Sequence, residues 1–244
     1  MSQDLTYNLS AFADRLFREK RLLPLAGKIR RARDLHSLAT DLVMAVESLN
    51  SLDVLLALPT DPDDHDKLIT ESALLNNALI LYVRATKTDS RERDGFDLRA
   101  RFDEAQKLVH KELCDLRDSA IAHFGSGGDY GGEWQAELVI LQFQGSEAKP
   151  AIATRRQTVD RNLAGRARQQ IEVALEMMRA LSREKLDEVT LALNEAAAAD
   201  PKFSEEVWVH PLNFDLFMKS EAAADAARAS FSAGGYVKGG IQHS

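Results

Sequence analysis

The stretch LRDSAIAHF, residues 116–124, places a cation and an imidazole close together. The guanidinium of Arg117 can bind a phosphodiester, and the imidazole of His123 can take up or release a proton near neutral pH. Glycines follow directly after this stretch, so His123 is expected in the last turn of a helix. The partial negative charge at a helix C-terminus favours the protonated imidazole. These residues therefore predict binding of a phosphate ester together with proton transfer.

A long amphipathic helix over residues 97–124 is expected to carry both side chains. Its apolar positions form one stripe, made of Leu98, Phe102, Ala105, Val109, Leu113, Leu116 and Ala120. At roughly 100° per residue, Arg117 lies on one margin of this stripe and His123 on the other, with Asp118 on the outer side. Both members of the pair therefore point toward whatever packs on this helix. Position alone leaves an alternative, in which either side chain simply caps carbonyls at the helix end.

Three further polar residues could support the pair. His110 lies on the same margin as Arg117, two turns earlier, and could line the same groove. Tyr82 and Arg84 belong to an apolar helix expected over residues 67–87, and they could approach the motif helix. The alternative interpretations are core packing for Tyr82 and a surface ion pair for Arg84.

The net charge of −7 argues mildly against general binding of nucleic acid. The charge is unevenly distributed, however, because residues 149–185 hold nine basic side chains against four acidic ones. Five arginines within fourteen residues stand out as candidates for binding RNA phosphates: Arg155, Arg156, Arg161, Arg166 and Arg168. The other interpretation of this run is a solvated helix face beside a basic hairpin.

Several classes of chemistry have no support in the sequence. The single cysteine, Cys114, allows neither an intrachain disulfide nor a cysteine zinc cluster, and no phosphate-binding glycine loop or nucleophile elbow is present. His65 and the acids around it could bind a cation weakly, but acids at a helix start are the preferred interpretation. We therefore expect no metal and no cofactor. No signal peptide and no membrane-spanning stretch are expected, which favours the cytoplasm.

The overall pattern predicts a mainly α protein, a helical bundle with a small inserted β-hairpin. Expected helices cover residues 2–19, 29–58, 67–87, 97–124, 160–199 and 221–230. Alternating apolar residues predict two strands, 134–144 and 151–159, around a turn at 145–149. We expect residues 1–199 to form the bundle, with the hairpin at about 134–159. Residues 200–244 are expected to form a C-terminal wrap, irregular over 203–217, and a flexible glycine-rich tail.

The string LRDSAIAHFG resembles the R-x(4–6)-H signature of HEPN-domain proteins, in which an arginine and a polar residue lead to a helix-terminal histidine. The residues of this string are similar to those of abortive-infection-like HEPN proteins of bacteria. The preceding helix, with LILYVR at 79–84, and the strand pair after the motif also resemble that group. The resemblance covers about residues 30–195 as an architecture and about ten residues as a motif. One departure is Gly125, which stands where toxins of one HEPN class have tyrosine, so an antitoxin of the nucleotidyltransferase type has no support.

The resemblance implies a HEPN-like bundle that forms a homodimer through the helix at 98–124 and cleaves RNA without a metal. In that role His123 would act as general acid or base, and Arg117 would bind the scissile phosphate. Asp118 matches the family's polar position, where it would orient the site or cap the helix. The protein would then be a toxin or antiphage-defence effector, with an antitoxin or other regulatory partner. The alternatives are a non-catalytic HEPN-like module that binds a partner protein or a nucleotide, and a plain helical scaffold.

Overall fold

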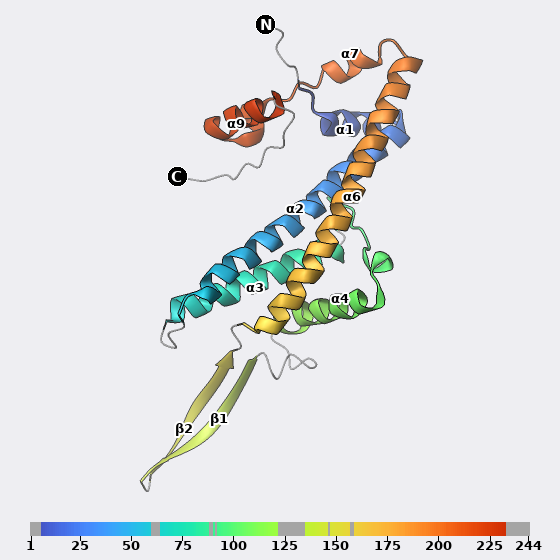
Figure 1. The fold of residues 1–244 in the computed structure, drawn as a ribbon. Coiled ribbons are helices and arrows are strands. Elements are labelled where there is room, and N and C mark those ends of the chain that lie inside the picture. The colour runs from blue at the N-terminus through green and yellow to red at the C-terminus, as the bar shows by residue number, and fades with distance from the viewer. Residues whose placement is uncertain are drawn as a thin grey trace. The chain divides into compact units, whose positions relative to one another are not determined.

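The computed structural model describes residues 6–59, 64–87, 90, 92–121, 135–145, 147–156 and 159–232. These residues form a mainly helical protein with one two-stranded antiparallel hairpin, which confirms the expected fold class (Figure 1). The chain divides into two compact units, one of Asp34–Glu184 and one of Met1–Arg33 with Lys185–Ser244. The boundary expected between residues 199 and 200 falls inside the second of these units and stays a prediction.

Four helices build the core of the Asp34–Glu184 unit: α2 (Leu23–Ala57), α3 (His65–Thr86), α4 (Glu104–Leu116) and α6 (Arg161–Ala199). On α2 the inward face consists of buried leucines at helical spacing, namely Leu35, Leu38, Leu42, Leu49 and Leu52. They pack in one cluster with residues of the other three helices, including Leu79, Leu113 and Ile171. Each fully buried leucine contributes about 1.5–3 kcal/mol of transfer free energy, so this stripe favours the packing of the four helices.

The acidic segment before α3 serves as a helix start. The side chain of Asp64 accepts a hydrogen bond from the backbone N–H of Lys67 at 3.0 Å and so caps the helix. This confirms the preferred interpretation of the acids around His65. Residues 60–63 lie outside the described part of the chain.

The continuous helix expected over residues 97–124 is wrong at its beginning. Residues Arg99–Arg101 form a short 3-10 turn (η1), and α4 begins only at Glu104. The cause is a capping box, in which Asp103 accepts from the N–H of Gln106 at 2.8 Å while the Gln106 side chain accepts from the N–H of Asp103 at 3.0 Å. These reciprocal bonds fix the helix start and separate η1 from α4.

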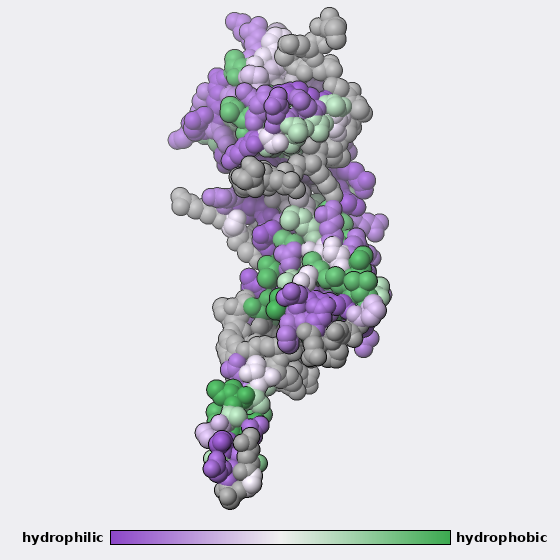
Figure 2. Space-filling view, turned by 90° about the vertical axis from the view of Figure 1, so that its left-hand side faces the viewer, coloured by the Kyte–Doolittle hydropathy of each residue, from purple (hydrophilic) through white to green (hydrophobic). Residues whose placement is uncertain are grey.

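The expected hairpin is confirmed, with strands β1 (Gln135–Gln144) and β2 (Glu147–Arg156) in an antiparallel register that pairs Val139 with Ile152. The second strand begins four residues earlier than expected, because Gly145 at φ 64° closes a tighter turn. Side chains alternate between the two faces of a strand, so Val139, Leu141, Phe143 and Ile152 share one face, and all four are exposed. Figure 2 shows hydrophobic side chains on the surface of the hairpin.

The other unit contains α1 (Leu9–Glu19), α7 (Phe203–Trp208), α8 (Phe214–Met218) and α9 (Glu221–Ser232). A separate cluster of buried residues holds it together, including Phe12, Leu16, Ile29, Val189 and Phe203. The irregular segment expected over 203–217 is wrong, since two short helices occupy most of it. One physical reason is the side chain of Asn213, which accepts from the N–H of Leu216 at 3.1 Å and starts α8. The helix expected at 221–230 is confirmed.

Within the described residues, the structure contains no helix whose length and apolar character would let it cross a bilayer.

Candidate functional site

Helix α4 changes its winding at the position of the predicted motif. Residues Arg117–Ile121 form a π-helical turn (η2), which packs against α3. Single π-turns are rare and are frequent at functional sites. Their hydrogen bonds span five residues instead of four, so wheel positions calculated at about 100° per residue do not hold beyond Arg117. The expected placement of Asp118 on the outer side therefore has to be replaced by its observed contacts.

Asp118 joins two cations into one cluster. Its carboxylate accepts a hydrogen bond from Lys87 Nζ at 2.8 Å and another from Arg117 Nη1 at 2.8 Å. The hydrogen bond from Lys87, followed by the one from Arg117, lowers the pKa of Asp118, and the same contact raises the pKa of Lys87. All three side chains are partly exposed, at 51% for Lys87, 35% for Arg117 and 41% for Asp118. The cluster therefore keeps a net charge of +1 that solvent or a ligand can reach.

The guanidinium of Arg117 is only partly satisfied. Its Nε is buried, and no described residue accepts a hydrogen bond from it. A buried donor without an acceptor costs roughly 1–3 kcal/mol, and such groups in native proteins need an explanation. His123 lies outside the described residues, so its distance from Arg117 stays a prediction.

His110 does not line a groove beside Arg117, as expected, because it belongs to the core and is 7% exposed. Its Nδ1 lies 2.8 Å from the hydroxyl of Tyr82 on α3, which also accepts a hydrogen bond from Gln170 Nε2 on α6 at 3.1 Å. Burial lowers the pKa of His110 and raises the pKa of Tyr82. These residues link α3, α4 and α6 as neutral groups, and for Tyr82 core packing is the correct interpretation.

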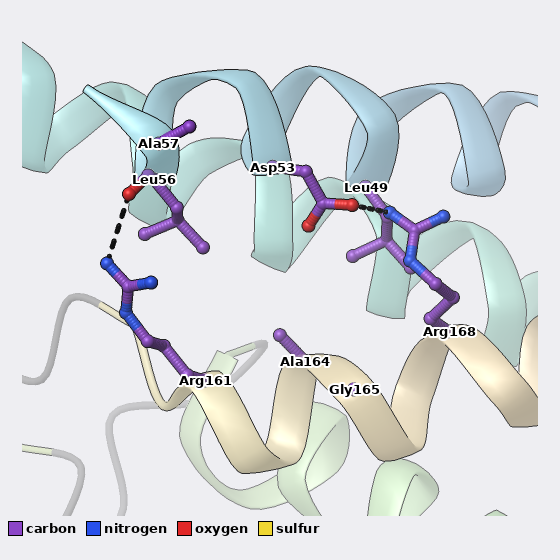
Figure 3. A pocket seen from close by; sticks show the side chains of 8 residues that line it. All are labelled: Leu49, Asp53, Leu56, Ala57, Arg161, Ala164, Gly165 and Arg168. Atoms are coloured by element: carbon purple, nitrogen blue, oxygen red, sulfur yellow. Dashed lines mark hydrogen bonds and ion pairs between the residues drawn. The ribbon is translucent and has the colours of Figure 1, made fainter.

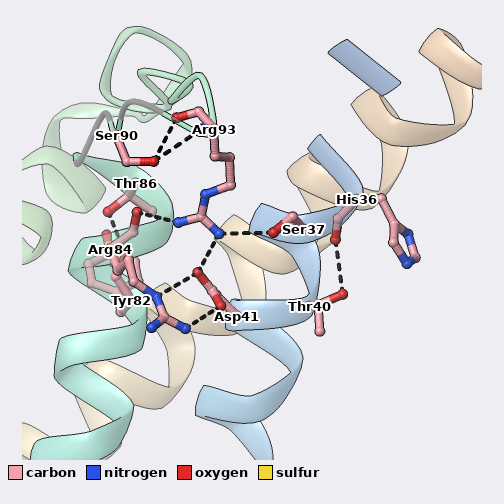
Figure 4. A network of polar contacts seen from close by, with 9 residues as sticks. All are labelled: His36, Ser37, Thr40, Asp41, Tyr82, Arg84, Thr86, Ser90 and Arg93. Carbon is pink, nitrogen blue, oxygen red and sulfur yellow. Dashed lines mark hydrogen bonds and ion pairs between the residues drawn. The ribbon is translucent and has the colours of Figure 1, made fainter. Parts of the chain in front are cut away.

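Arg84 takes part in an ion pair, the second of the two interpretations from the sequence (Figure 4). It donates to Asp41 on α2 through Nε at 2.9 Å and Nη2 at 2.5 Å. This hydrogen-bonded carboxylate raises the pKa of Arg84. Arg93 donates to the same carboxylate at 2.8 Å and to Ser37 Oγ at 3.1 Å, which fastens the chain after α3 to α2. Arg93 and Asp41 were not predicted as partners, because they are 52 residues apart in the chain.

The arginines on α6 are held by groups of neighbouring helices. Arg166 pairs with Glu112 on α4 at 2.5 Å, and Arg168 pairs with Asp53 on α2 at 2.7 Å. Arg161 donates to the carbonyl oxygen of Leu56 at 3.1 Å. Packing therefore partly neutralises the positive charge of this segment. These three arginines do not form a continuous surface of unpaired cations. Arg155 and Arg156 end β2, and their side chains lie outside the described part of the structure.

A pocket of about 290 Å³ opens between the end of α2 and the start of α6 (Figure 3). On its α2 wall Asp53 lies between Leu56 and Leu49, the α6 wall includes Ala164 and Gly165, and Arg161 and Arg168 lie toward its two ends. The sequence analysis did not find this pocket, because its two walls are more than a hundred residues apart.

The described residues contain no group of three or more His, Cys, Asp or Glu side chains that could hold a metal ion. Comparison with known proteins found no matching family model, no matching curated protein and no matching solved structure. The candidate site consists of Arg117, Asp118 and Lys87 at the contact of α3 with the π-turn, and its chemistry has to be argued from these side chains.

Proposed function

We propose that this protein is a metal-independent endoribonuclease of the HEPN type, acting in the cytoplasm as a homodimer in a toxin or defence role. The observation that carries the proposal is the cluster of Lys87, Asp118 and Arg117 at a π-turn, six residues before His123. The spacing of arginine and histidine agrees with the HEPN signature, and the cluster supplies positive charge at the arginine.

Arg117 and Lys87 would bind the scissile phosphate of an RNA strand. A phosphate oxygen would accept hydrogen bonds from the exposed part of the Arg117 guanidinium and from Lys87 Nζ. Asp118 stays ionised because its pKa is lowered, and it holds both cations at fixed positions. As the ribose 2′-oxygen attacks phosphorus, negative charge grows on the phosphate oxygens, and two fixed cations stabilise that charge more than mobile ones would.

His123 would move the protons of the reaction. One imidazole takes the proton of the 2′-hydroxyl while the new P–O bond forms, and a second imidazole in its protonated form gives a proton to the leaving 5′-oxygen. The products are a 2′,3′-cyclic phosphate and a 5′-hydroxyl. A single chain has one such histidine, so the two imidazoles come from two copies of the chain related by a two-fold axis.

Helix α4 offers a surface for this homodimer. Leu108 lies at its middle and is 71% exposed, although it is a large apolar side chain. A second α4 packed on this face and parallel to the first would cover Leu108 and place the two π-turns at the same end of the interface. The exposed Leu108 is the observation that supports a dimer through the segment 98–124.

The test is cleavage of a single-stranded RNA by the full chain in EDTA, with analysis of the product ends. We expect cyclic phosphates and 5′-hydroxyls, loss of activity in His123→Ala, and a loss of at least about 100-fold in Arg117→Gln, which corresponds to about 2.8 kcal/mol. Arg183→Gln, an exposed arginine elsewhere on α6, is the matched control and should cleave like the wild type. Cleavage that survives the change at His123 would contradict the proposal.

A second candidate is a non-catalytic module that binds a partner protein, and the hairpin favours it. The apolar face of Val139, Leu141, Phe143 and Ile152 is exposed, and exposed apolar patches often mark binding surfaces. Absence of RNA cleavage, together with a partner lost on changing Phe143 to Ser, would favour this candidate over the ribonuclease.

A further inference from the structure

The pocket between α2 and α6 carries an inference that does not depend on the proposed function. Both of its walls belong to the Asp34–Glu184 unit, and it lies at the end of α2 and the start of α6 (Figure 3). Its volume of about 290 Å³ is near the lower end of the range found for small-molecule sites. A lining of leucine and alanine side chains together with a few charged groups is also typical of such sites.

Arg161 provides a cation at one end of the pocket. Among the described residues, the only group that it contacts by a hydrogen bond is the carbonyl oxygen of Leu56, through Nη2 at 3.1 Å. No described carboxylate neutralises its charge. The side chain is exposed, and its remaining N–H groups can bind an anionic group of a ligand.

Arg168 and Asp53 close the other end as an ion pair. Arg168 lies seven residues after Arg161 on α6, hence two turns and roughly 10 Å along the axis, on nearly the same side of the helix. It donates to Asp53 Oδ2 at 2.7 Å and to Asn50 at 2.8 Å. The other oxygen of Asp53 accepts no hydrogen bond from the described residues, and the side chain is 63% exposed. Arg168 Nη1 also lies 3.6 Å from Glu172 Oε1, so this end carries one excess negative charge and can accept an N–H group.

Gly165 is exposed and belongs to the α6 wall of the pocket. Glycine inside a helix lowers helix stability relative to alanine, and it is usually explained by a close contact or an unusual backbone. Neither explanation applies here, because a Cβ at Gly165 would meet nothing within 4 Å and its φ is ordinary. The space that a side chain at Gly165 would fill is open and borders the pocket.

We propose that this pocket binds a small aromatic carboxylic acid. The carboxylate would pair with Arg161, the flat ring would lie over Gly165 and Ala164 against Leu49 and Leu56, and a ring N–H would donate to Asp53. The absence of a side chain at Gly165 allows the ring to approach the backbone of α6. A second negative charge at the far end of the ligand would be repelled, because Arg168 is already paired with Asp53 and Glu172.

The experiment uses indole-3-acetate as the probe and measures its binding to the full chain by titration calorimetry and by chemical shifts. We expect saturable binding that weakens at least tenfold when indole-3-acetamide replaces the acid, and equally in Arg161→Gln. Gly165→Ala should raise the melting temperature of the free protein and still weaken binding, because the methyl group stabilises the helix and enters the pocket. General unfolding of the variant could not explain this result, because it would lower the melting temperature and the binding affinity together.

The matched control is Arg166→Gln, next to Gly165 but paired with Glu112 on α4 and outside the pocket. This variant should bind the probe like the wild type. Absence of saturation up to about 10 mM indole-3-acetate, or equal binding in Gly165→Ala and the wild type, would overturn the proposal. Equal binding of the acid and its amide would overturn it as well, since the charge at Arg161 would then play no part.

Discussion

Lys87 Nζ and Asp118 Oδ2 lie 2.8 Å apart, and this contact joins the end of α3 to the π-turn after α4. Asp118 holds Arg117 with its other oxygen, so one carboxylate fixes two cations that approach from different helices. A guanidinium that stands alone at a helix end samples many rotamers. Here the contact with Asp118 restricts Arg117, which reduces the entropy that binding of a phosphate would cost.

Changing Lys87 to Gln is expected to slow RNA cleavage about tenfold, a loss of about 1.4 kcal/mol in transition-state stabilisation. The variant removes one of the two cations and leaves Asp118 to neutralise Arg117. Initial rates and RNA affinity, measured at two salt concentrations, check this prediction. Lys107→Gln is the matched control, because Lys107 pairs with Glu104 on the surface of α4 and should be dispensable. Equal rates for the Lys87 variant and the wild type would show that Lys87 has no part in binding the phosphate.

The ion pairs of Asp118 with Lys87 and Arg117 are also expected to make the stability of the fold depend slightly on pH in the acidic range. Its pKa is lowered in the folded protein, so the ion pairs stabilise the fold above the ordinary pKa of 3.8. This contribution is lost as the pH falls through the lowered value. Because the side chains are partly exposed, we expect about 1 kcal/mol or less. Urea unfolding of the wild type and Asp118→Asn should differ at pH 7, and the difference should disappear as the pH falls below the lowered pKa of Asp118.

Removing the hydroxyl of Tyr82 is expected to lower the free energy of unfolding by more than the loss of a surface contact would. Tyr82→Phe keeps the ring and its packing, but it leaves His110 Nδ1 and Gln170 Nε2 without their shared partner in the core. Unsatisfied buried polar groups cost roughly 1–3 kcal/mol. The measurement is the free energy of unfolding in urea. Tyr7→Phe, in the other unit, provides the comparison, and a smaller loss for Tyr82 than for Tyr7 would contradict the importance of this buried contact.

The helices were largely predictable, because leucine spacing on α2 and α6 reports which face is buried. The start of α2 was missed for a physical reason. The expected helix begins at residue 29, but the observed helix is Leu23–Ala57 and has Pro24 in its first turn, where the N–H that proline lacks would have no partner within the helix. The start of α4 had a readable signal, since Asp103 and Gln106 have the spacing of a capping box.

The candidate site was predictable only in part. Arg117 and Asp118 are neighbours in the chain and belong to a recognisable motif, so the sequence was enough to select them. Lys87 could not be selected in that way, because its partner Asp118 is 31 positions away and only packing of α3 on the π-turn brings them together. The π-turn itself gives no simple periodic signal, since it changes the winding of the chain for only five residues.

The stability of the protein is expected to fall between pH 7 and pH 5 because of His110. Burial lowers its pKa, so the imidazole is neutral when folded and takes up a proton when unfolded. The stability is therefore full above the ordinary histidine pKa of 6.5 and decreases as the pH falls below it. Urea unfolding at several pH values gives the slope, and His110→Gln should reduce it. A slope that is the same in both proteins would assign the dependence to other histidines.

The proposed dimer through α4 leads to the last prediction. Leu108→Arg places a charge at the centre of the exposed face of α4, where the wild type has an apolar side chain that is 71% exposed. In a dimer two such arginines would face each other without water, so the variant should be monomeric. Since Leu108 is exposed, the fold of the single chain should be unchanged by circular dichroism.

Light scattering after size exclusion measures the mass of each variant. The matched control is Leu191→Arg, which changes a leucine of α6 that is 59% exposed and should leave the dimer intact. The same samples can be assayed for RNA cleavage, because the mechanism needs one histidine from each copy. A monomeric Leu108 variant that cleaves RNA at the wild-type rate would separate the two claims and show that the catalytic groups lie within one chain. A wild-type protein that is monomeric at every concentration would instead contradict the dimer itself.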